Sequence, residues 1–140
     1  MSCTVYGKPQ GKGRPRYTVR GGHAVAYTPE GTRKYEAQIR QAWQEQDGRS
    51  FGSAALALIV TAYYPVPSKA RKAEREAMLS GHVPVRDKPD LDNLLKAVMD
   101  ALNSIAYEDD KQITHINAAR TYSGTPRIEI DLIPIKGEDL

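Results

Sequence analysis

The spacing of apolar residues in the first third of the chain predicts one long helix. Tyr35, Ile39 and Trp43 repeat at the interval of one helical face. Thr28-Pro29-Glu30 has the features of a helix start: a capping hydroxyl, a proline at the first position and an acid near the positive end of the helix dipole. We therefore expect a helix from this tripeptide to about Gln46.

Two further helices are predicted in the second half of the chain. Ser68 is expected to cap a charged helix that ends at Gly81, and the few apolar residues in this segment indicate that the helix lies mostly in solvent. A stripe that includes Leu94, Val98 and Leu102 indicates an amphipathic helix that packs on the core and ends near residue 104.

Four segments have the pattern of β-strands: residues 4–6, 55–64, 114–123 and 126–135. The second is almost continuously apolar, which predicts burial on both faces. In the last one, Ile128 and its i+2 neighbours alternate with acids and should face the core. The pattern predicts an α+β fold, a single domain over residues 1–140 with a mixed sheet of three to four or more strands and two to three helices.

Composition adds few constraints to this picture. With 140 residues, 40% hydrophobic and 26% charged, the chain resembles an ordinary globular domain. A single cysteine, Cys3, excludes an internal disulfide and a zinc site built on several thiolates. No apolar run approaches the ~20 residues of a spanning helix, and the first residues lack a signal-peptide pattern. We therefore expect a cytoplasmic protein without a membrane partner.

The distribution of charge is more informative than the net charge of +3. The segment Lys8–Arg20 carries five cations and no acid, and its glycines and prolines predict a loop or an open hairpin. Such a segment fits a polyanionic partner, although a plain solvated loop has the same composition.

The stretch KPDLDNLLK (88–96) carries the first candidate chemistry. Two residues apart on a helix is a turn of about 200°, so Asp90 and Asp92 converge only if Asp90 is still extended. Pro89 makes a helix that starts after this point plausible, because residues before a proline are pushed to extended conformations. Lys96 and Asp100 share the polar helix face with Asp92. The competing interpretation is that these acids only cap the helix.

A second acidic group, YEDDKQ, follows the same helix and contains Glu108, Asp109 and Asp110. A helix of about 12 residues would separate the two groups by roughly 18 Å. They share a site only if the chain folds back or two subunits contribute; otherwise this group is a solvated turn. Three converging carboxylates would suit Mg²⁺ or Mn²⁺.

The stretch DLDNLLKAVMDALN followed by YEDDKQI closely resembles the RusA family of Holliday-junction resolvases, and GKPQGKGRPR and AYTPEGTRKYEAQI resemble that family more loosely. The resemblance spans nearly the whole chain. It implies a phage-derived type of homodimeric, Mg²⁺-dependent endodeoxyribonuclease, with Mn²⁺ as a substitute ion. Such enzymes introduce paired nicks at four-way junctions in DNA recombination and repair, and a prophage origin would fit.

Carried over by position, the resemblance implies that Asp90, Asp92 and Asp110 hold the metal and that Lys96 is the essential lysine. Asp109, Asp100 and Asn93 would support them, and the shorter turn here leaves both Asp109 and Asp110 open as the third carboxylate. Lys88-Pro89 replaces an arginine-rich run of some members, which shifts phosphate contacts elsewhere. The expected DNA-binding residues are Lys8, Lys12, Arg14, Arg16, Arg20, Arg86 and Lys88.

Two other functions remain open at this point. One is a non-catalytic, structure-selective DNA-binding protein whose acids are caps and surface charges. The other is a Mg²⁺ enzyme acting on other phosphate substrates, such as a nucleotide hydrolase, which the absence of a phosphate loop disfavours.

Overall fold

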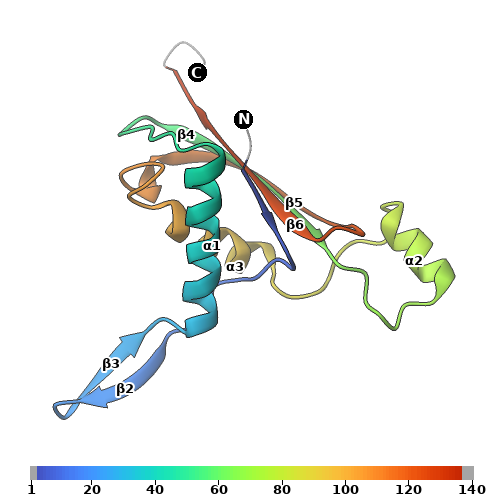
Figure 1. Ribbon diagram of the computed structural model, residues 1–140, viewed down its shortest axis with the longest axis horizontal. Coiled ribbons are helices and arrows are strands. Elements are labelled where there is room, and N and C mark those ends of the chain that lie inside the picture. The colour runs from blue at the N-terminus through green and yellow to red at the C-terminus, as the bar shows by residue number, and fades with distance from the viewer. Residues whose placement is uncertain (1–2, 137–140) are drawn as a thin grey trace.

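A four-stranded mixed sheet forms the centre of the computed structural model, which describes residues 3–136 (Figure 1). Its strand order is β1 (Cys3–Tyr6), β6 (Arg127–Pro134), β4 (Leu56–Tyr64), β5 (Ile113–Tyr122). The pairs β1–β6 and β6–β4 are antiparallel, whereas β4–β5 is parallel. A parallel pair needs a long crossover, and the chain between β4 and β5 supplies it with two helices. The predicted α+β class with a mixed sheet is confirmed.

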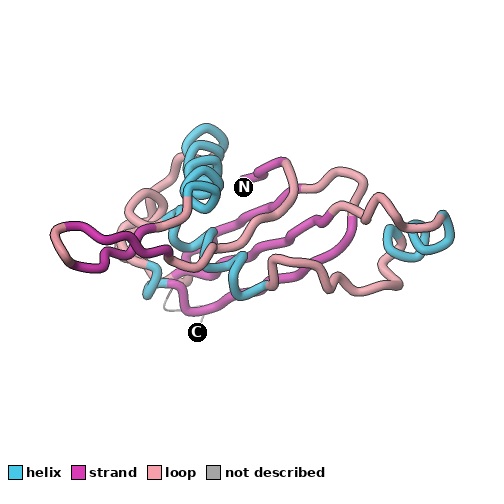
Figure 2. Tube along the Cα trace, turned by 90° about the horizontal axis from the view of Figure 1, so that it is seen from below, coloured by secondary structure: helices cyan, strands magenta, loops and turns pink. Residues whose placement is uncertain are grey.

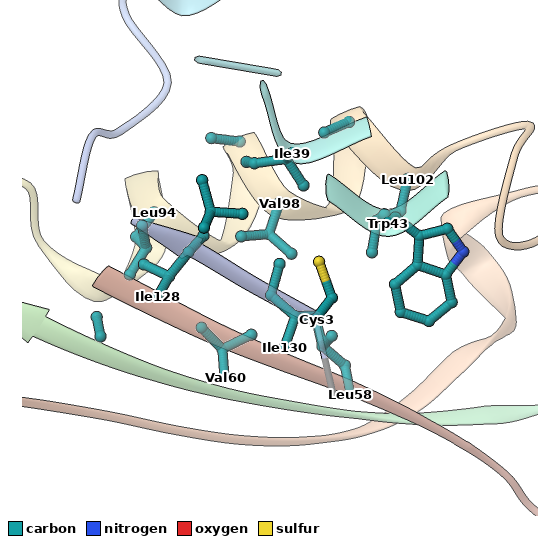
Figure 3. Packing of buried hydrophobic residues seen from close by; sticks show 14 of the residues in the cluster. Cys3, Ile39, Trp43, Leu58, Val60, Leu94, Val98, Leu102, Ile128 and Ile130 are labelled. Carbon is teal, nitrogen blue, oxygen red and sulfur yellow. The ribbon is translucent and has the colours of Figure 1, made fainter. Parts of the chain in front are cut away.

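Two helices cover one face of this sheet. Helix α1 (Glu30–Gln46) and helix α3 (Leu91–Leu102) present their apolar stripes to the strands. Figure 3 shows the resulting core, in which Val98 and Ile39 of the helices lie over Val60 of β4 and Ile130 of β6. Ile128, Ile130 and Leu132 all face inward, as their alternation predicts.

The expectation that β4 is buried on both faces was wrong. Its residues alternate between buried and half-buried along the whole strand, because the described helices pack on only one face of the sheet. Leu58 and Val60 belong to the buried set, and Ile59 between them belongs to the other. A continuous apolar run therefore does not by itself indicate two covered faces.

Both predicted hydroxyl caps were also wrong, although the helices are present. Helix α1 has Pro29 at its N-cap position and no side-chain cap bond, so Thr28 does not cap it. Helix α2 (Lys72–Leu79) begins after Arg71 rather than after Ser68, because residues 68–70 form a turn first. Helix α2 has no buried residue, as expected for a charged helix.

A separate hairpin lies outside the main sheet. Strands β2 (Arg16–Arg20) and β3 (His23–Tyr27) pair with each other, and Gly21 and Gly22 form the turn with φ of +56° and +78°. Glycine adopts such left-handed angles without the strain of a side chain. The hairpin and α2 project at opposite ends of the molecule (Figures 1 and 2). No helix among residues 3–136 is long and apolar enough to cross a membrane.

Candidate active site

The first acidic group lies where the extended chain before α3 becomes helical. Asp90 has extended backbone angles (φ −72°, ψ 167°), and its Oδ1 accepts the backbone N–H of Asn93 at 3.0 Å. The prediction that Asp90 stands outside the helix is confirmed, and Asp90 is also the helix cap. The cap bond uses Oδ1, and a carboxylate has a second oxygen that can bind a further partner.

Asp92 and Lys96 lie one turn apart on the solvent side of α3. The Lys96 Nζ is 3.4 Å from the Asp92 Oδ2, and the two side chains are 59% and 78% exposed. An ion pair this exposed contributes little to stability. Both charged groups are therefore accessible to a ligand that approaches the start of α3.

Three side chains of β4 and β5 hold the segment that precedes Asp90. Arg120 donates to the carbonyl oxygens of Asp87 at 2.9 Å and Pro89 at 3.2 Å, and its guanidinium lies over the Tyr64 ring. The Tyr64 hydroxyl also donates to the Pro89 carbonyl, and the Tyr122 hydroxyl donates to the Asp87 carboxylate. These bonds fix the backbone from which Asp90 projects.

The basic loop between β1 and β2 packs against the same end of α3. The Lys12 backbone N–H donates to the Asn93 carbonyl at 2.9 Å, and the Gly13 N–H donates to the Thr32 hydroxyl of α1. A Cβ on Gly11 would lie 2.7 Å from the Pro89 Cβ, and one on Gly13 would lie 2.8 Å from the Thr32 Oγ1. The two glycines are thus what allows the loop to approach both helices.

Lys12 connects the loop to the far end of α3. Its Nζ is 2.8 Å from the Asp100 Oδ2 and 3.3 Å from the Glu36 Oε1. Burial lowers the pKa of Lys12, but its bonds to Asp100 and Glu36 outweigh that effect and leave the pKa raised. Among the residues expected to bind DNA, Lys12 is therefore already engaged with two carboxylates of its own chain.

A hollow of about 590 Å³ lies between the basic loop and the start of α3. Its walls bring together Lys8, Arg14 and Lys88 with Asp90 and Asn93. With Lys12, which also lines the hollow, the structure thus places four cations beside Asp90. Such a hollow is suited to a phosphate group held next to carboxylates.

The second acidic group contains two aspartates with different surroundings. Asp109 caps the short 3₁₀ helix Asp110–Gln112 by accepting the Lys111 N–H at 2.9 Å, and this bond keeps the Asp109 pKa below its ordinary value. Gln112 completes the turn by accepting the backbone N–H groups of Glu108 and Asp109. Asp109 therefore has the structural duty of a cap.

Asp110 has no such duty. Partial burial raises its pKa first, and the neighbouring carboxylates of Asp109 and Asp100 raise it further. Asp100 also binds Lys12, so the carboxylate that acts on Asp110 is itself paired with the basic loop. Added positive charge would stabilise an ionised Asp110 here.

The family match covers this whole arrangement. A family model described as "Endodeoxyribonuclease RusA" matches residues 6–133. The chain belongs to the RusA endodeoxyribonuclease family. It is also 30% identical over 135 residues to "Uncharacterized protein YqaN" of Bacillus subtilis (strain 168), a match that covers 93% of this chain and 95% of that protein. The resemblance inferred from the sequence is confirmed.

In the described part of this chain, the expected metal ligands do not form one cluster. Within residues 3–136, no three His, Cys, Asp or Glu side chains are grouped so that they could hold a metal ion. The 12 residues of α3 span about 18 Å, with Asp90 and Asp92 at one end and Asp110 beyond the other. The oxygen donors suit Mg²⁺, but one chain supplies them as two separate groups.

The remaining expected DNA-binding residues lie on the segment before α3 or on the hairpin. Arg86 is exposed on the segment before Lys88, and Arg16 and Arg20 belong to β2. Sequence reasoning missed Arg120, which orders the segment before Asp90. The sequence did offer a signal: Arg120 alternates with Ala118 and Tyr122, so it shares their strand face. A charged side chain on such a face needs hydrogen-bond partners within the fold.

Proposed function

We propose that this RusA-family chain is a Mg²⁺-dependent endodeoxyribonuclease that resolves Holliday junctions as a homodimer, in DNA recombination and repair. The observation that carries the proposal is the hollow in which Lys8, Arg14 and Lys88 surround Asp90. Cations hold the DNA backbone there through its phosphates. The adjacent carboxylates are the group types that a metal-assisted hydrolysis needs.

Each residue has a distinct part in this proposal. Asp90, Asp92 and Asp110 would hold the ion, and when bound it would supply an activated water and charge neutralisation at the phosphodiester. Lys96 offsets charge on the same phosphate, since its ammonium is exposed beside Asp92. Arg120 is a positioning residue, because it fixes the backbone of residues 87–89 and touches no reacting atom.

The separation of the two acidic groups supports a site built from two chains. In one chain α3 holds Asp90 and Asp92 apart from Asp110. In a two-fold symmetric dimer, the amino end of α3 in one protomer can meet the turn 108–112 of its partner. Symmetry then requires the same contact between the partner's α3 and the first protomer's turn. The dimer would then have two equivalent sites, which matches paired nicks at a two-fold symmetric junction.

Nicking of a labelled four-way junction tests the activity. We expect the purified protein to cut the junction in strands of like polarity when Mg²⁺ is present and to bind without cutting when it is absent. A linear duplex of the same sequence is the control and should remain intact. Junction binding with no cutting under any divalent ion would leave the non-catalytic DNA-binding protein as the function.

Mixed dimers test whether two chains build each site. Asp92→Asn and Asp110→Asn should each be inactive alone. In a mixed dimer, a shared site combines the intact Asp92 of one protomer with the intact Asp110 of the other, so one of the two sites is restored. Recovery of single nicks after the two variants are mixed supports the shared site. If mixing restores nothing although subunits exchange, the carboxylates act within one chain.

A further inference from the structure

The hairpin β2–β3 is an arm without acidic residues and with unusual apolar exposure. All ten of its strand residues are exposed, among them Tyr17 at 71%, Val19 at 73% and Tyr27 at 46%. A two-stranded hairpin alone is marginally stable in water. Its exposed aromatic and branched side chains therefore indicate a surface that binds a partner.

The strand register divides the arm into two different faces. Arg16 lies opposite Tyr27, Thr18 opposite Val25, and Arg20 opposite His23, and directly paired residues share a face. We call these six residues the charged face. The other face, which we call the apolar face, has no charged residue and consists of Tyr17, Val19, Ala24 and Ala26.

The charged face has the chemistry of a nucleic-acid surface. A hollow of about 360 Å³ on this face is lined by Thr18, Arg20, Val25 and Tyr27. Arginines contact phosphates, and a tyrosine ring stacks on a base without regard to its identity. The arm sequence from Arg16 to Tyr27 contains no acid that would repel DNA.

The arm also starts beside the candidate active site. Arg14 lies two residues before the first residue of β2, and it lines the same hollow as Asp90. Gly13 is bound to Thr32 in the first turn of α1, so both ends of the arm leave the body near this point. Figure 1 shows the arm projecting from the start of α1. A DNA strand held at the hollow can therefore continue along the arm.

From these observations we propose that the arm is a DNA-binding β-ribbon, with Arg16 and Arg20 on phosphates and Tyr27 stacked on a base. The inference rests on the proposed function for its ligand, a four-way junction. It adds a binding site around Thr18, His23, Val25 and Tyr27. A base available for stacking is found where a junction exchanges strands and base stacking is interrupted.

Two matched double variants test the assignment. Arg20→Thr with Tyr27→Thr removes one arginine and the tyrosine ring of the charged face, and Tyr17→Thr with Val19→Thr alters only the apolar face. Threonine is well tolerated in strands, so both variants retain the hairpin. Fluorescence anisotropy without divalent ions measures junction affinity and its salt dependence apart from cutting.

We expect the charged-face variant to bind the junction about tenfold more weakly and with a shallower salt dependence. The apolar-face variant should bind within about twofold of the parent protein. The conservative pair Arg20→Lys with Tyr27→Phe should restore most of the affinity, because it retains a cation and a ring. Photocrosslinking to a junction with 5-iodouracil at the exchange point should label Tyr27 and leave Tyr17 unlabelled.

Three outcomes would overturn the inference: unchanged affinity in the charged-face variant, equal losses in both variants, or a dimer weakened by the apolar-face variant. The last result would assign the arm to subunit contact. Failure of the proposed catalysis is separately visible, because Mg²⁺-dependent nicking does not enter the affinity measurement. An arm that binds DNA in a protein that never nicks would leave this inference standing.

Discussion

The acidic groups before and after α3 lie in different electrostatic surroundings. At the amino end, Asp92 is exposed beside Lys96, and Lys88 lies in the hollow with Asp90. At the carboxyl end, burial and nearby carboxylates raise the pKa of Asp110. The amino end is thus prepared for a phosphate, whereas the carboxyl end would be stabilised by an added cation. The comparison explains why neither end alone has the composition of a complete hydrolytic site.

The largest expected effect comes from the amino end. Asp92→Asn should abolish junction nicking, because the variant loses a proposed ligand while keeping the shape of the side chain. Junction binding should be unchanged or tighter, since one negative charge near the phosphates is gone. Nicking and anisotropy assays on the same preparation check both statements. Full nicking activity in this variant would refute the assigned role of Asp92.

The carboxyl end offers a matched pair of neighbours. Asp110→Asn should reduce nicking by at least about a hundredfold, an effect of the size that removal of a charge-stabilising group has in other sites. Asp109→Asn should nick nearly as well as the parent protein, because asparagine also caps a helix. The ratio of the two rates measures which aspartate acts in the reaction. The opposite ranking would make Asp109 the third carboxylate.

Much of this comparison could be predicted from residue spacing. Two residues apart on a helix differ by about 200° in direction, so convergence with Asp92 required Asp90 to lie outside the helix. The structure confirms the extended backbone of Asp90. The length of α3 showed that the acidic groups lie far apart in one chain, and it left folding back and a second subunit as alternatives. Among residues 3–136 no three carboxylates are grouped so that they could hold a metal ion.

Other features depended on tertiary contacts that spacing does not report. The charge of Lys12 indicated a DNA contact, yet its ammonium binds Glu36 and Asp100, which lie 24 and 88 positions further along the sequence. The apolar run of β4 suggested two covered faces, but helices pack on only one. Arg120 has no local motif, because its partners are backbone carbonyls brought close by the fold.

A smaller effect should come from packing at the amino end. In Gly11→Ala the new Cβ would lie 2.7 Å from the Pro89 Cβ and 3.0 Å from the Asn93 Cβ, so the basic loop must move away from α3. We expect a loss of about 1–3 kcal/mol in the free energy of unfolding, measured by thermal or urea unfolding.

Gly31→Ala is the control for that substitution. A Cβ at Gly31 meets nothing within 4 Å, and the position lies in α1, where alanine favours the helix. This variant should be as stable as the parent protein or more so by about 0.5–1 kcal/mol. Equal stability of the two alanine variants would mean that the loop does not pack on α3 as described.

The smallest expected effect concerns pH and separates Asp109 from Asp110 once more. Because the folded-state pKa of Asp110 is raised, its favourable contribution to folding is complete below the ordinary value of 3.8 and is lost as pH rises through the raised pKa. Asp109 has a lowered pKa, so its contribution is present above 3.8 and is lost as pH falls through the lowered value.

Asp110→Asn should therefore raise the melting temperature slightly at neutral pH, and the gain should disappear in acid. Asp109→Asn should lower it slightly at neutral pH, and that loss should disappear in acid. Thermal unfolding of both variants across this pH range measures the two signs. Because both side chains are largely open to water, the shifts should be small and should shrink in high salt. Shifts of the same sign would mean that the two carboxylates share one environment, and the contrast between a structural cap and a group that favours a cation would then fail.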